Sequence, residues 1–183
     1  MSDPAAISVD AALAPLRARA DTGAGQTLFS GGATQAALGP DLALHVDPAA
    51  RLDGVWRSPR GRLLELETRV TQPGAWFALH LGLPAQLADL SDVTWLGLAA
   101  RSSAARAVAV RACLRSGTGD GFHDCILDRH ILSQPRESDH HDLLAPEHHP
   151  DLPRQAPWRE FILFLPPAEP LDWVLHDLRL FVL

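Results

Sequence analysis

The chain has 183 residues, enough for one domain with a sizeable hydrophobic core. Hydrophobic residues make up 46% of it and charged residues 21%, as in an ordinary globular protein. A formal net charge of −6 argues against a nucleic-acid binder, which needs a concentrated basic surface. The sequence lacks Lys, Asn and Tyr, whose codons are AT-rich, so we expect a GC-rich bacterial source. Apart from any protonated His, every side-chain cation is therefore a guanidinium, which suits carboxylates, phosphates and sugar hydroxyls.

Residues 1–26 are rich in Ala and are predicted to form a tail or docking segment, either helical or irregular. Leu13 and Leu16 fall on one face of a possible short helix, which Pro15 would bend or end. The simpler interpretation is a partly ordered tail, and the alternative is a segment that docks on a protein partner.

The arrangement of charges near the N-terminus does not match a secretory signal. Arg17 and Arg19 come late in the segment, whereas a signal peptide has its cations first and then an unbroken apolar stretch. We therefore expect synthesis in the cytoplasm without a signal peptide. No run of 18 apolar residues occurs, so no membrane span is expected.

From residue 27 to residue 183, short apolar stretches alternate with clusters of Gly, Pro, Asp and Ser, which is typical of an antiparallel β-sandwich. The expected strands are Leu42–Val46, Arg62–Thr71, Ala75–Leu83, Val93–Arg101, Ala107–Arg115, Phe122–Leu127, Trp158–Leu165 and Trp173–Leu183. The stretch Ser133–Pro157, rich in Pro, His and acidic residues, is expected to be a long surface loop.

Alternation within these strands predicts which side chains face the core. In Ala75–Leu83, the residues at odd positions, such as Phe77, form an apolar face, and Trp76 and His80 lie on the other. In Ala107–Arg115, Val108, Val110, Ala112 and Leu114 face the core, and in Arg62–Thr71 so do Leu64, Leu66, Thr68 and Val70. The last two strands are apolar on both faces, which predicts that they are central in their sheets or covered by the N-terminal segment.

Four segments carry a resemblance to a known fold family. They are "ADLSDVTWLGLAARS" (88–102), "AVAVRACLRSGTGDGFHDCIL" (107–127), "PWREFILFLPP" (157–167) and "LDWVLHDLRLFVL" (171–183). Their order resembles the galactose-binding-like jelly roll of many carbohydrate-binding modules, from Leu79 to the C-terminus. The resemblance implies an all-β jelly roll that binds its ligand on a sheet face or in loops at one end. A structural calcium is common in such modules, but no loop here has the clustered oxygen ligands it needs. No cofactor is expected.

The predicted hairpin 107–127 suggests a ligand-binding face. If its strands pair symmetrically about Gly119, Cys113 lies opposite Cys125 and Arg115 lies opposite His123. The side chains then turned away from the core make the candidate carbohydrate site: Trp76, His80, Arg111, Arg115 and His123. An aromatic ring can stack on a pyranose, and the Arg and His groups can bind hydroxyls or the carboxylate of an acidic sugar. The alternative is a solvated outer face.

Catalytic chemistry has little support in the sequence. Cys113 and Cys125 are expected to be reduced thiols, or a cross-strand disulfide if the register allows it. A catalytic cysteine using His123 would lack a third group to orient the histidine. The acidic pair Glu65 and Glu67 fits surface charge better than glycoside hydrolysis. We therefore expect that the protein is not an enzyme.

One segment could bind a metal ion. "SDHHDLLAPEHH" (138–149) contains four histidines among acidic residues, namely His140, His141, His148 and His149, which are weak candidates for zinc ligands. The alternative is a polar loop that gains positive charge as the pH falls toward 6.

Three functions remain open at this point. The leading one is a non-catalytic carbohydrate-binding protein that recognises a cell-surface or capsular polysaccharide. Without an export signal, such a protein could be released by lysis as a spike or fibre component of a phage-like particle, with residues 1–26 as its anchor. The second is a structural or assembly module with a protein interface, and the third is a metal-assisted hydrolase that uses the His-rich segment.

Overall fold

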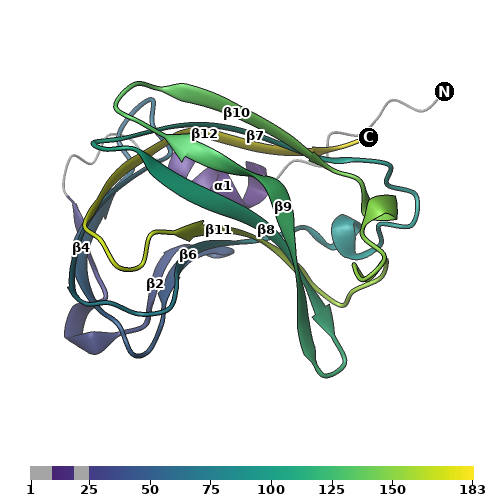
Figure 1. The fold of residues 1–183 in the computed structure, drawn as a ribbon, viewed down its shortest axis with the longest axis horizontal. Helices are drawn as coiled ribbons and strands as arrows, with labels where there is room; N and C mark the ends of the chain where they lie inside the picture. The colour runs from purple at the N-terminus through teal and green to yellow at the C-terminus, as the bar shows by residue number, and fades with distance from the viewer. Residues whose placement is uncertain (1–9, 19–24) are drawn as a thin grey trace.

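A computed structural model describes residues 10–18 and 25–183 as one β-sandwich with a short helix (Figure 1). Two six-stranded sheets face each other, and every pair of neighbouring strands is antiparallel. Sheet A consists, in spatial order, of β1 (Gln26–Leu28), β4 (Arg51–Arg57), β5 (Leu64–Gln72), β12 (Leu171–Val182), β7 (Leu96–Ala104) and β10 (Ser138–Leu144). Sheet B consists of β2 (Gln35–Gly39), β3 (Leu42–Val46), β6 (Phe77–Gly82), β11 (Arg159–Leu165), β8 (Val108–Thr118) and β9 (Gly121–Ser133). The predicted all-β jelly-roll architecture is confirmed.

The core lies between the two sheets, and the predicted alternation decides which side chains enter it. Phe77, Leu79 and Leu81 of β6 are fully buried, as are Val110 and Leu114 of β8. The last two strands are central as predicted, because β11 lies between β6 and β8, and β12 lies between β5 and β7. Burial of apolar surface at about 25 cal/mol per Å² makes this core the main source of stability.

Helix α1 (Asp10–Arg17) packs onto the sandwich. Leu13 and Leu16 are buried in the main core, and Pro15 packs against Gly39 of β2. The hydroxyl of Ser58 donates a hydrogen bond to the carbonyl oxygen of Leu16. The apolar face of the helix is therefore buried against the sandwich, which stabilises the helix even though it contains a proline. Residues 1–9 and 19–24 of the predicted tail lie outside the described residues.

The predicted surface loop 133–157 contains a strand, so that prediction is wrong for residues 138–144. β10 pairs with β7 along its whole length and turns Asp142 and Leu144 inward. The carboxylate of Asp142 accepts hydrogen bonds from the backbone N–H groups of Arg129 (3.1 Å) and Leu143 (2.9 Å). Because the polar Asp142 occupies an inward position, this edge strand lacks the apolar alternation that identifies a strand in the sequence.

The β8–β9 hairpin differs by one residue from the predicted register. Thr118 pairs with Gly121, so the turn contains two residues and its centre is not at Gly119. Leu114 consequently lies opposite Cys125, and Cys125 enters the core while Cys113 lies on the other face of the sheet. Both cysteines are free and buried, and their opposite orientation excludes the cross-strand disulfide.

Candidate functional site

The candidate site is the outer face of sheet B, the side of that sheet turned away from the core. Trp76, His80, Arg111 and Arg115 of the predicted site lie on this face. His123 does not, because the shifted register pairs it with the inward-facing Ser116. The predicted position opposite Arg115 is occupied by Asp124, which sequence reasoning missed.

Arg115 is fixed in position on this face by its neighbours. Its Nε and Nη2 atoms donate hydrogen bonds to the two carboxylate oxygens of Asp124, at 2.6 and 2.7 Å. The guanidinium also stacks over the ring of Phe122, 3.8 Å from its centroid. The hydrogen bond to Asp124 raises the pKa of Arg115. Arg115 is therefore a neutralised, preorganised group and not a free cation.

A second polar pair lies beside Arg115. The backbone register places Glu160 of β11 directly opposite Arg115, and its Oε2 lies 2.9 Å from Nδ1 of His80. This hydrogen bond lowers the pKa of Glu160. The His45 ring lies 4.3 Å from the His80 ring, and burial followed by the charge of His80 lowers the pKa of His45. Strand alternation in 42–46 and 158–165 would have placed both His45 and Glu160 on this face.

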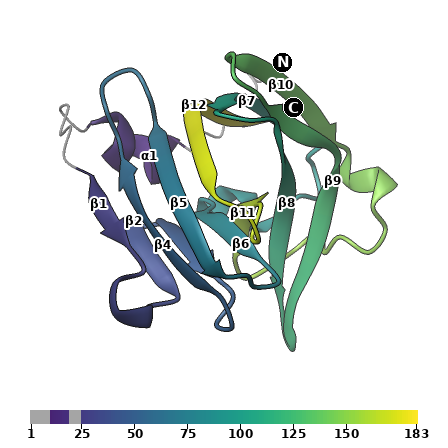
Figure 2. The same cartoon turned by 60° about the vertical axis from the view of Figure 1, so that its left-hand side comes forward.

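Two aromatic side chains are exposed where the long β8–β9 hairpin extends beyond the other strands (Figures 1 and 2). Trp158 is 42% exposed and Phe122 is 56% exposed. The Trp158 indole packs directly over Gly117, so closely that a Cβ there would overlap it. Gly117 pairs with Phe122, so both rings meet solvent at the same end of the face. Exposed rings of this kind can stack on the apolar side of a sugar.

The centre of the outer face is apolar. Ala78, Cys113 and Ile162 are fully buried there and Phe164 packs against them. Burial raises the pKa of the Cys113 thiol to about 12. A thiol with so high a pKa is not a nucleophile near neutral pH, because the thiolate is the reactive form.

At the other end of the face, a hollow of about 250 Å³ lies beside Trp76. Arg111, Phe164 and His130 form part of its wall, and the backbone register places these three side by side across the strands. The Arg111 guanidinium lies over the Phe164 ring, 5.4 Å from its centroid. Sequence reasoning found Trp76 and Arg111, but the predicted strand ended before His130.

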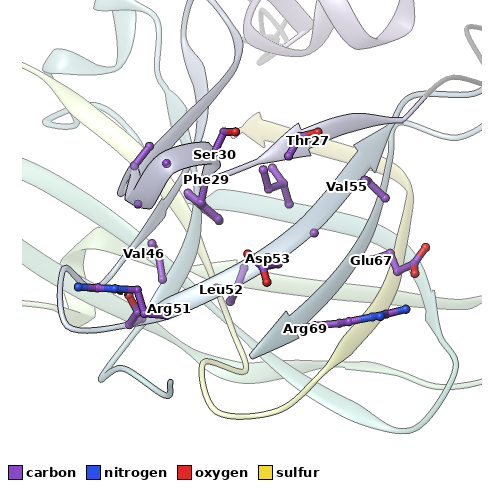
Figure 3. A pocket seen from close by; sticks show the side chains of 16 residues that line it. Thr27, Phe29, Ser30, Val46, Arg51, Leu52, Asp53, Val55, Glu67 and Arg69 are labelled. Atoms are coloured by element: carbon purple, nitrogen blue, oxygen red, sulfur yellow. Dashed lines mark hydrogen bonds between the residues drawn. The ribbon is translucent and has the colours of Figure 1, made fainter. Parts of the chain in front are cut away.

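A larger hollow of about 580 Å³ lies between β4 and the turn that follows β1 (Figure 3). Arg51 lies on one side of it, and Glu67 and Arg69 lie on the other, with Asp53 between them. Its aromatic residue, Phe29, is only 6% exposed and packs edge-on against Phe77 in the core. Without an exposed ring, this hollow suits sugar stacking less well than the outer face of sheet B.

The four histidines of the His-rich segment do not converge. His140 and His141 are successive residues of β10 and point to opposite faces, while His148 contacts Glu147 and the ring of Trp95. No group of three or more His, Cys, Asp or Glu side chains within residues 10–18 and 25–183 could hold a metal ion. Within the same residues, no helix is long and apolar enough to cross a membrane.

Known proteins resemble this chain in structure but not detectably in sequence. No protein-family model matches, and no curated protein matches at a significant level. The family 11 carbohydrate-binding module of the cellulosomal cellulase Lic26A-Cel5E of Clostridium thermocellum has a TM-score of 0.55 at 12% identity, covering 87% of this chain and 95% of that one. A family 11 module from Clostridium thermocellum in complex with a β-1,3-1,4-mixed-linked tetrasaccharide has a TM-score of 0.52 at 13% identity, covering 86% and 95%. A family 30 carbohydrate-binding module has a TM-score of 0.53 at 12% identity, covering 96% and 86%. The chain thus has the jelly-roll sandwich fold found in these carbohydrate-binding modules.

Proposed function

We propose that the protein binds a polysaccharide without catalysis, through the outer face of sheet B. The observation that carries this proposal is one face that combines exposed rings with charged side chains already fixed by hydrogen bonds. Rings provide stacking surface, and the Arg115–Asp124 and His80–Glu160 pairs offer donors and acceptors to sugar hydroxyls. Because these pairs are already ordered, binding loses little side-chain entropy.

The fold supports the ligand class, since several solved sandwiches with this fold are carbohydrate-binding modules and one is in complex with a tetrasaccharide. Fold alone does not define function, so the ligand class depends on the side chains of the face. The Asp124 and Glu160 carboxylates are already held by hydrogen bonds to Arg115 and His80, and the Cys113 thiol is buried with a raised pKa, which supports recognition over catalysis. A cell-surface or capsular polysaccharide is the ligand we propose.

Binding to a panel of capsular polysaccharides, measured by calorimetry, tests the proposal. One ring is removed from the face in each of three variants, Trp158→Ala, Phe122→Ala and Trp76→Ala. We expect the most affected variant to bind at least about fivefold more weakly, because an aromatic contact is worth about 1 kcal/mol beyond its burial. Trp95→Ala is the matched control, because this half-buried ring contacts His148 away from the face. Undiminished binding by all three variants would exclude the outer face of sheet B.

The protein could act at the surface of a phage-like particle made in the cytoplasm and released by lysis. Leu13 and Leu16 of α1 are in the core, so the anchor is tested by removing residues 1–9 and leaving α1 in place. Particle association that survives removal of residues 1–9 would refute an anchor in that segment.

A second candidate, an assembly module, is favoured by one observation. The edge strand β9 exposes three apolar side chains, Phe122, Ile126 and Leu132. An exposed apolar edge can pair with another chain. A stable oligomer by light scattering, without binding to any polysaccharide in the panel, would favour this candidate over the first.

A further inference from the structure

The two arginines on the outer face of sheet B differ in their electrostatic surroundings. Arg115 forms an ion pair with Asp124 at 2.6 Å and lies opposite Glu160. Arg111 forms no ion pair with any of the described residues and is exposed to solvent. Its contact is the ring of Phe164, which supports the guanidinium without neutralising it. Arg111 therefore keeps its full charge for a ligand.

The hollow beside Arg111, named here the Trp76 pocket, contains no carboxylate. Its lining residues are Ala75, Trp76, Ala109, Arg111, His130, Phe164, Leu165, Pro166 and Pro167. Asp47 contacts the backbone of Ala75 from outside this lining, and its carboxylate accepts the N–H groups of Ala49 and Ala75. Among the residues that line the pocket, Arg111 is thus the one that carries a fixed charge, and it is a cation.

The size and walls of the Trp76 pocket fit one sugar residue. Its volume of about 250 Å³ is below the roughly 300–1,000 Å³ of sites that enclose drug-sized ligands. The half-buried indole of Trp76 provides a stacking surface for a pyranose ring. The planar fork of Arg111 can donate two parallel hydrogen bonds to a carboxylate, and a ring nitrogen of His130 can donate another.

We propose that the Trp76 pocket binds the carboxylate of an acidic sugar residue, so that the ligand is an anionic, uronate-containing polysaccharide. This inference rests on the proposed function, because it assigns the ligand class of the same face. Arg111 presents a guanidinium in a pocket whose lining contains no carboxylate, which favours an anionic ligand at this place on a protein of net charge −6. Charge therefore contributes to specificity and to the orientation of the chain on the sheet.

The inference is tested by comparing the binding of polysaccharides that have their carboxylates with the binding of forms that lack them. The probes are polygalacturonate, alginate and hyaluronan, each compared with its carboxyl-reduced form, in which the carboxylate has become a primary alcohol. We expect at least one of the three to bind, with its reduced form at least tenfold weaker. Arg111→Gln should remove most of that difference, and Arg111→Lys, which keeps the charge but not the planar fork, should restore only part of it.

The matched control is Arg101→Gln, because Arg101 is an exposed arginine on the outer side of sheet A. It should leave the preference for carboxylates unchanged. Equal binding of native and reduced polymers, or equal binding of dextran sulfate, would overturn the carboxylate site while leaving carbohydrate binding intact. If no polysaccharide of either kind binds, the proposed function itself fails together with this inference.

Discussion

Arg159 shows how much a single buried residue organises in this fold. Its side chain is 3% exposed, and its guanidinium donates to carbonyl oxygens of residues 87–88 and 153–154 at 2.6 to 3.3 Å and to the hydroxyl of Ser116. None of these acceptors is a carboxylate, and burial lowers the pKa of Arg159. One cation thus joins three separate segments at one end of the sandwich.

Replacing this arginine should destabilise the protein strongly. In Arg159→Met the carbonyl oxygens lose their donors, so we expect the free energy of unfolding to fall by about 3 kcal/mol. Arg106→Met, at an exposed arginine, should change it by less than about 0.5 kcal/mol. Urea denaturation of the two variants measures the difference. Equal losses would mean that the hydrogen bonds of Arg159 contribute nothing specific.

At the scale of the element, strand β4 depends on a glycine for its pairing with β5. Gly54 lies opposite Thr68, and a Cβ at residue 54 would overlap the carbonyl oxygen of Glu67 in the neighbouring strand. A backbone atom cannot rotate out of the way as a side chain can. The absence of a side chain is therefore a requirement of the sheet, although glycine weakens most strands.

We expect Gly54→Ala to lower the free energy of unfolding by about 2 kcal/mol, because the two strands must separate to admit the methyl group. The control is Gly119→Ala in the β8–β9 turn, where a Cβ meets nothing within 4 Å. That variant should stay within about 0.5 kcal/mol of the wild type. Thermal and urea unfolding both report the change. A Gly54→Ala protein as stable as the control would show that the strands adjust freely.

At the scale of the whole molecule, pH should act on stability through half-buried histidines. Burial lowers the pKa of His45, His140 and His176 below the ordinary value of 6.5. Between their folded pKa values and 6.5, the unfolded chain binds more protons, so the free energy of unfolding falls as the pH falls. The pKa of Glu160 is also lowered, chiefly by its hydrogen bond to His80, so its contribution is present above pH 4.5 and lost as pH falls through its folded pKa.

Urea midpoints between pH 3 and pH 8 should therefore be flat above pH 7 and decline on acidification in two stages, first from the histidines and then from Glu160. His176→Gln is the informative variant, because glutamine can still bond to Ser103 but does not titrate. Its stability should decline less than that of the wild type between pH 6.5 and 5. A parallel decline in both proteins would mean that His176 does not contribute.

The sequence was sufficient to predict the sandwich and most of its strands. Apolar alternation reveals a strand whenever one face is buried, as in β5, β6 and β8. It does not reveal β1 and β2, which are only three and five residues long, or β4 and β10, in which Gly54 and Asp142 interrupt the apolar inward positions. The same parity rule put Trp76, His80, Arg111 and Arg115 on one face, since which side of a strand a residue takes is a local property.

Only the tertiary structure decided which side chains are neighbours in the site. The β8–β9 hairpin has a two-residue turn and is not centred on Gly119. This shift of register turns His123 inward, places Asp124 opposite Arg115 and puts the two cysteines on opposite faces of the sheet. Glu160 and Phe164 reached the site from a strand more than thirty residues away along the chain, through the pairing of β11 with β8. Alternation determines the face of each side chain, but its neighbours depend on register and strand order, which are set by packing across the whole sandwich.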